Sequence, residues 1–172
     1  MSSLPLEGGL LDRFLFDSFV HTIRSGLEQI GWFEPDRYGQ EHPINWRVEP
    51  VNLDQEIPHN TVVPSFEDLT EEDGEIGSTL TLQRRMAWVD IYAESFSLGL
   101  HLSGDIRAIL GGKMPSIGRD DPSIMVVDWS EPEPRPELVL VDVLDIGEER
   151  SHTPTSQRNW FAVRCTLEEA RP

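Results

Sequence analysis

Two stretches of the chain place apolar residues at the three- and four-residue steps of an amphipathic helix. The first lies within residues 10–30 and ends before Gly31 and Pro35, which stop a helix; its stripe is Leu11, Leu15, Phe19, Ile23, Leu27 and Ile30. The second lies within residues 95–110. Ser95 or Ser97 can cap its start, and Gly111-Gly112 ends it. Its apolar stripe is Leu98, Leu102, Ile106, Ile109 and Leu110. The spacing therefore predicts two helices.

Other stretches alternate apolar and polar residues or are short and apolar, which predicts strands. The predicted strands are 44–49, an edge strand at 61–66, a long strand at 79–93, and strands at 124–129, 138–146 and 160–167. The apolar parity shifts within 79–93, which predicts a bulge near Arg84-Arg85. The strand 138–146 is nearly apolar through Val143, so we expect both of its faces to be covered. In the last strand Phe161, Val163, Cys165 and Leu167 share one face.

The segment 67–75 concentrates negative charge and resists an assignment to regular structure. Like charges repel, and the segment buries almost nothing, so it predicts a solvated loop that is mobile in the isolated subunit. An inert solvated loop is one alternative, and a loop that faces a partner is the other. Its six carboxylates are Glu67, Asp68, Glu71, Glu72, Asp73 and Glu75.

These elements predict an α/β protein of the α+β kind, with two amphipathic helices packed on one mixed, mostly antiparallel sheet of about five strands. A chain of 172 residues has the length of one domain. No internal repeat is visible, so we expect a single domain over residues 1–172.

The charge, the apolar stretches and the single cysteine of the chain limit the classes of function that we expect. The chain is 38% hydrophobic and 26% charged, and 14 Lys and Arg against 31 Asp and Glu give a net charge of −17. This charge repels a phosphate backbone, so binding of nucleic acid through phosphate contacts is not expected. No apolar stretch is long enough for a bilayer, and Met1–Gly9 has no basic residue for a secretory signal. With Cys165 as the single cysteine, we expect a reducing, cytosolic environment.

Catalytic signatures are weak throughout the sequence. Gly111-Gly112-Lys113 lacks the frame of a phosphate-binding loop, Asp120-Asp121 precedes Pro122 in a turn-forming setting, and Cys165 is predicted to be a buried thiol. No histidine lies three or four residues from another histidine or from the cysteine, so no zinc-ligand pair is visible; they are His21, His42, His59, His101 and His152. We expect no enzyme, no cofactor and no metal.

The tryptophans carry more information. Trp46, Trp88, Trp129 and Trp160 each lie within a predicted strand. A small domain has limited room to bury four indoles with paired N–H groups. We therefore expect one or two of them to face a partner, although core packing is the commoner role of a strand tryptophan.

The second half of the chain has a recognisable order. A strand ending Val89-Asp90-Ile91-Tyr92-Ala93 leads into the helix at 95–110, an apolar strand to Trp129, a strand ending Asp145-Ile146-Gly147-Glu148-Glu149-Arg150, and a strand opening Arg158-Asn159-Trp160. Over residues 80–170 this order resembles the tail terminator proteins of long-tailed phages. The N-terminal helix is consistent with that resemblance.

The resemblance implies a structural protein of the virion that is assembled in the host cytoplasm. Members of the family form a ring, expected here to be a hexamer, that caps the tail tube and joins it to the head. The implied partners are copies of the chain itself, the major tail tube protein and a head-completion or connector protein. DNA would pass through without specific binding, and the charge of −17 fits that role as well as it fits plain solubility or an acidic host proteome.

Candidate contact residues follow from the charge pattern. In so acidic a chain, arginines are suitable partners for a neighbouring subunit's carboxylates, and we expect Arg84, Arg85, Arg150 and Arg158 at the ring interface. We expect the acidic segment to line the bore or to dock on the tube. The alternatives are another head–tail joining protein, an acidic DNA-mimic inhibitor, which would need its acids on rigid elements, and an uncharacterised enzyme.

Overall fold

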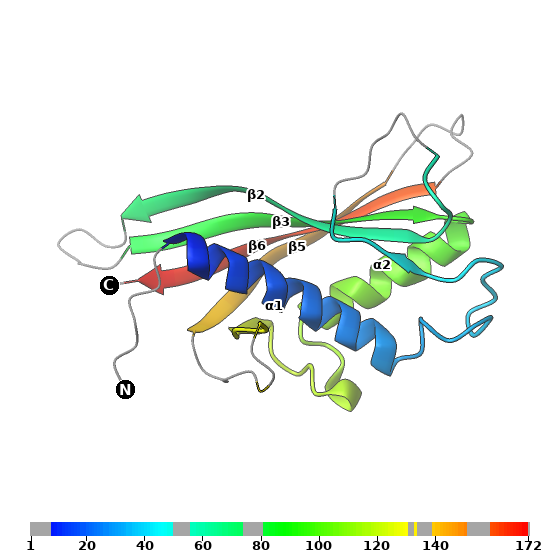
Figure 1. Ribbon diagram of the computed structural model, residues 1–172, viewed down its shortest axis with the longest axis horizontal. Coiled ribbons are helices and arrows are strands. Elements are labelled where there is room, and N and C mark those ends of the chain that lie inside the picture. Colours follow the sequence, from blue (N-terminus) through cyan, green and yellow to red (C-terminus); the bar gives the residue numbers. More distant parts are fainter. Residues whose placement is uncertain are drawn as a thin grey trace.

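The computed structural model describes residues 8–49, 56–73, 81–130, 133, 139–150 and 159–171. It shows two helices on one mixed sheet of six strands, in the order β1-β2-β3-β6-β5-β4 (Figure 1). This confirms the predicted fold class, with six strands in place of about five. The two helices lie on the same face of the sheet, so the molecule has two layers.

The predicted helices are present at nearly the predicted bounds. Helix α1 spans Gly8–Gln29 and helix α2 spans Phe96–Leu110. Ser95 caps α2 by accepting a hydrogen bond from the Leu98 amide at 3.2 Å. Gly31, at φ 92°, terminates the N-terminal helical segment in the left-handed conformation that glycine tolerates.

Antiparallel pairing dominates the sheet. Strands β3 and β6 pair over their full lengths without a register shift, and the only parallel pair among the described strands is β1 with β2. The strands are β1 Asn45–Trp46, β2 Thr61–Asp73, β3 Thr81–Ala93, β4 Ser123–Val126, β5 Val139–Arg150 and β6 Asn159–Arg171.

One core lies between the helices and the facing side of the sheet. The helical stripes contribute side chains such as Phe19, Ile23 and Leu102, which are fully buried. The predicted face of the last strand is confirmed: Phe161, Val163, Cys165 and Leu167 are at most 2% exposed. Burial on this scale accounts for most of the stability of a domain of this size.

The acidic segment is where the sequence prediction was wrong. Glu67–Asp73 belongs to strand β2, and its residues from Leu69 to Asp73 pair with β3 from Arg85 back to Thr81. Backbone pairing gives these residues a strand without requiring that their side chains be buried. The remaining predicted loop residues, Gly74 and Glu75, lie outside the described residues.

Three strand details also differ from the predictions. The register shift lies in β2, where two residues between Phe66 and Leu69 oppose the single Met86, so β3 itself is not bulged near Arg84-Arg85. Strand β1 covers two residues instead of the predicted six. Strand β5 is covered on one face only, because Leu140 is 54% exposed while its neighbour Val141 is buried.

Candidate functional site

The face of the sheet opposite the helices is one candidate contact surface. Side chains alternate along a strand, so Trp88, Asp90 and Tyr92 of β3 lie opposite the buried Val89 and Ile91. All three are partly exposed, as is Trp160, which pairs with Tyr92 on the neighbouring strand β6. No helix of the described chain covers this face (Figure 1). We call it the helix-free face.

The tryptophans of the helix-free face have polar partners. The Trp160 indole donates to Asp90 Oδ1 at 3.1 Å, and the Trp88 indole donates to Glu67 Oε1 at 2.9 Å. Burial raises the pKa of Asp90, and the hydrogen bond from Trp160 partly opposes that rise. An aromatic ring with a satisfied N–H and an exposed body suits a contact surface.

An apolar patch continues the helix-free face toward strands β4 and β5. Met125 is 41% exposed, and it pairs directly with Leu140, which is 54% exposed. Leu144, four residues along the same strand, is 39% exposed. Large apolar side chains that stand together at the surface mark contact sites more often than isolated ones do.

The four predicted contact arginines do not form one cluster. Arg84 and Arg85 are consecutive on β3, and the Arg84 Nε lies 2.7 Å from Glu168 Oε2. Arg85 pairs with Leu167, whereas Arg150 pairs with Phe161, six residues away on β6, which corresponds to about 20 Å along the strand. Arg158 lies outside the described residues.

Arg150 belongs to a network that joins β5 to α2. Its guanidinium lies 2.7 Å from Glu148 Oε1, and Arg107 of α2 lies 3.0 Å from Glu148 Oε2. The buried Ser103 hydroxyl donates to the same Glu148 carboxylate at 2.6 Å. Only 6% of the Glu148 side chain is exposed, so the two arginines offset the cost of burying its charge. Arg150 therefore forms an ion pair within its own subunit, with the buried carboxylate of Glu148.

The acidic residues lie on the free edge of the sheet. Strand β1 pairs with β2 only at Thr61 and Val62, so the rest of β2, including Glu67–Asp73, has no described neighbour on that side. Glu67 is exposed, and it receives the Trp88 hydrogen bond already described. A row of charge on a free strand edge opposes unwanted pairing with other chains.

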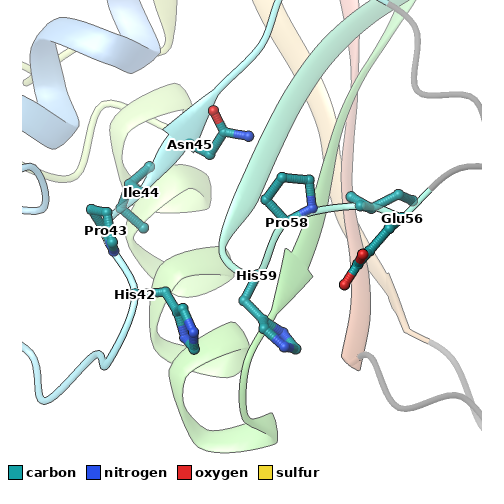
Figure 2. Close-up of a pocket in the computed structure, with 8 residues that line it drawn as sticks. His42, Pro43, Ile44, Asn45, Glu56, Pro58 and His59 are labelled. Atoms are coloured by element: carbon teal, nitrogen blue, oxygen red, sulfur yellow. The ribbon is translucent and has the colours of Figure 1, made fainter.

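A pocket of about 690 Å³ lies at the start of β1 and β2 (Figure 2). The segment 42–45 forms one wall and the segment 56–59 forms the other. The rings of His42 and His59 approach each other across it, with centroids 4.9 Å apart and planes tilted by 40°. The spacing of these histidines in the sequence gave no signal, because the pair is created by the parallel contact between β1 and β2.

Glu94 holds His42 in place. Its carboxylate accepts hydrogen bonds from the Glu41 amide at 2.7 Å and the His42 amide at 3.0 Å, and Oε2 lies 2.6 Å from His42 Nδ1. Burial alone would raise the pKa of Glu94, but the bonds from His42, Glu41 and Asn60 outweigh burial and lower it. Glu94 is therefore a carboxylate at neutral pH.

Asn60 completes the frame of the pocket. It is fully buried and adopts a left-handed conformation with φ 59°, which asparagine tolerates better than most residues. Its side-chain amide donates to the His42 carbonyl at 2.8 Å and accepts from the Glu94 amide at 3.0 Å. The residue next to His59 thus fixes both His42 and its carboxylate partner.

The other described histidines have different surroundings. His21 stacks on Trp129 with ring centroids 3.6 Å apart, and burial lowers its pKa although Glu28 raises it. His101 lies on α2 with Nε2 3.4 Å from Asp105 Oδ2. Within the described part of the chain, no three or more His, Cys, Asp or Glu side chains are grouped to hold a metal ion.

Cys165 and Trp32 are two buried residues with polar groups. Burial raises the pKa of Cys165 to about 12, so its thiol is not a nucleophile at neutral pH and the buried-thiol prediction is confirmed. Trp32 is fully buried, and its indole donates to Asp105 Oδ2 at 2.7 Å. Sequence reasoning missed Trp32 because it follows Gly31, outside every predicted strand.

The chain matches no protein-family model and no curated protein sequence. Neither α1 nor α2 combines the length and apolar character of a membrane-crossing helix within the described residues.

Proposed function

We propose that this protein is a tail terminator of a long-tailed phage, a structural subunit that forms a ring at the end of the tail tube. The single observation that carries the proposal is the element order β3, α2, β4, β5, β6, built on one mixed sheet with α1 on the same face. This is the order on which the resemblance rests. The proposal places the protein in the virion, at the junction between head and tail.

The helix-free face supports an assembly role. It offers the partly exposed Trp88 and Trp160 together with the apolar patch of Met125, Leu140 and Leu144. Aromatic residues and methionine are favoured at the centres of protein interfaces. In a ring, each subunit presents this face or a strand edge to a different surface of its neighbour, because closed rings use head-to-tail contacts.

The proposed partners are the tail tube protein on one side of the ring and a head connector on the other. The net charge of −17 keeps the subunit from gripping DNA that passes through the bore. The alternative most similar in function is another head–tail joining protein. A terminator would act on the tube end, whereas a head-closure component would act on the connector.

Light scattering during size-exclusion chromatography tests the proposal. A subunit of 19.6 kDa is expected to elute as a closed ring, alone or once a tube end is present as template. Leu140→Glu should reduce that mass to the monomer, and Leu100→Glu, which changes an exposed leucine on α2, is the matched control. A monomer under all conditions, with tubes that lengthen unchecked, would exclude a terminator.

One observation favours a second function, an acidic mimic of DNA. Such a mimic needs its carboxylates on a rigid element, and Glu67–Asp73 lies in strand β2 instead of a loop. A mimic would be a monomer or dimer that inhibits a DNA-binding protein. Replacing Glu71, Glu72 and Asp73 by Gln, Gln and Asn would abolish such inhibition. If the protein is instead a tail terminator, the same variant would leave ring assembly intact.

A further inference from the structure

The pocket at the start of β1 and β2 contains the imidazoles of His42 and His59, at a separation that suits two ligands of one metal ion. Zn²⁺ binds histidine nitrogens at about 2.0–2.1 Å, so two imidazoles on one ion have ring centres roughly 4.5–5.2 Å apart for angles between 90° and the tetrahedral value. The observed separation of His42 and His59 is 4.9 Å. The distance between the two ring centres therefore lies within the range that a shared ion requires.

The orientation of His42 suits a metal ligand. His42 Nδ1 lies 2.6 Å from Glu94 Oε2, and a ring nitrogen that donates to this oxygen leaves the lone pair of a neutral imidazole on Nε2. Histidine ligands commonly donate their second ring N–H to a carboxylate in this way, which fixes the tautomer and raises the basicity of the ligand. Half of the His42 side chain is exposed, so the ring is open to an ion from solvent.

His59 has no competing partner in the described structure. Its Nδ1 is shielded from solvent and makes no hydrogen bond with a described group. No described side chain therefore dictates which nitrogen of this ring carries the proton. The neighbouring Asn60 holds the backbone at this position, since it bonds both His42 and Glu94.

We infer that His42 and His59 together bind a divalent transition-metal ion, with water in the remaining coordination positions. The ion would join the segment that leads into β1 to the segment that leads into β2, so its role is structural. Imidazole ligands favour Cu²⁺, Ni²⁺ and Zn²⁺ over Mg²⁺ and Ca²⁺. The nearby carboxylate of Glu94 and the net charge of −17 attract cations to this edge.

Isothermal titration of the full chain with Zn²⁺ at pH 7.5 and physiological salt tests the inference. We expect one ion per chain, and at least a tenfold loss of affinity in His42→Gln and in His59→Gln. Glu94→Gln should weaken binding by about 10- to 100-fold through its loss of control over the His42 ring.

His101→Gln is the matched control, because it removes an exposed histidine beside a carboxylate on α2 and should leave Zn²⁺ affinity unchanged. Thermal unfolding without metal checks that each variant folds, and Zn²⁺ should raise the melting temperature of the wild type but not of His42→Gln. Equal binding of Mg²⁺, or Zn²⁺ binding that survives both pocket variants, would assign the effect to the acidic surface and overturn the inference. None of these readouts depends on ring assembly.

Discussion

The two faces of the sheet are made by the same strands but have opposite characters. On the helix-covered face, Val89 and Ile91 of β3 and Phe161 and Val163 of β6 are at most 1% exposed. On the helix-free face, the residues between them are aromatic, charged or small, and Trp88, Tyr92 and Trp160 remain partly exposed. Alternation along β3 and β6 places these two sets of side chains on opposite faces of the sheet.

This difference separates the residues that specify the fold from those that are available for contacts. The covered face needs both helices, because each contributes a stripe that closes the core. On the helix-free face, the indole N–H groups of Trp160 and Trp88 are already paired within the subunit, with Asp90 and Glu67. We therefore expect stability to depend on one face and assembly on the other.

The largest expected effect on stability is on the covered face. Phe161→Ala should lower the free energy of unfolding by about 3–5 kcal/mol, because it opens a cavity in a packed core. Leu144→Ala, on the helix-free face, should cost less than about 1 kcal/mol, since the side chain is 39% exposed. Denaturant unfolding of both variants measures the contrast, and equal losses would show that the helix-free face is also part of the core.

Two glycines on α2 have different surroundings. A Cβ at Gly99 would lie 2.2 Å from the Phe161 ring, so α2 packs against β6 at a distance that only glycine allows. Gly99→Ala should destabilise the protein by about 1–3 kcal/mol. Gly104→Ala has its nearest neighbour at 3.8 Å and should instead stabilise the helix by about 0.5–1 kcal/mol. The same sign for both variants in thermal unfolding would contradict this packing.

The covered face is also the part that the sequence predicts well. Stripes such as Phe19, Ile23 and Leu27, with stop signals after them, define the helices without knowledge of the tertiary structure. The apolar face of β6 is equally clear. Both signals arise from burial, which leaves a periodic pattern in the sequence.

The edges of the sheet were predicted poorly for a physical reason. The density of charge at Glu67–Asp73 indicated a loop. The segment is a strand because its backbone pairs with β3, and amino-acid composition carries no information about that pairing. Leu140 illustrates the opposite error, because an apolar residue indicated burial where the structure exposes it. The His42–His59 pair depends on a parallel contact between separate segments, so no local spacing encodes it.

The next smaller effect is on the pH dependence of the free energy of unfolding. The carboxylates of Asp90 and Glu94 should change it in opposite directions. The pKa of Asp90 is raised, so its contribution to stability is present when it is protonated and is lost as the pH rises through the folded pKa. Asp90→Asn should therefore gain stability relative to the wild type as the pH increases from the ordinary aspartate range. Its amide oxygen can still accept the Trp160 hydrogen bond.

The pKa of Glu94 is lowered, so its contribution is present above the ordinary glutamate range and is lost as the pH falls through the folded pKa. Glu94→Gln should lose stability relative to the wild type as the pH rises, which is the opposite trend. Unfolding free energies measured between pH 3 and 7 compare the two variants. Parallel curves would refute one of the two pKa directions.

The smallest effect on stability is expected at Arg84. Its ion pair with Glu168 at 2.7 Å lies on the helix-free face, and the arginine side chain is 41% exposed. Arg84→Ala should cost about 0.2–1 kcal/mol, and the cost should shrink at high salt. A loss of ring mass in Arg84→Ala without a comparable loss of stability would assign this arginine to assembly. A large, salt-independent loss of stability would instead show that Arg84 is needed for the fold.

Electron microscopy of the protein mixed with the tail tube protein proposed as its partner tests directly whether the protein is a tail terminator. We expect tubes that stop growing and carry a ring at one end, and we expect bare, growing tubes with Leu140→Glu, while Leu144→Ala remains folded. Wild-type protein that stays monomeric and leaves the tube ends bare and growing would contradict the claim that this fold is a ring-forming tail terminator.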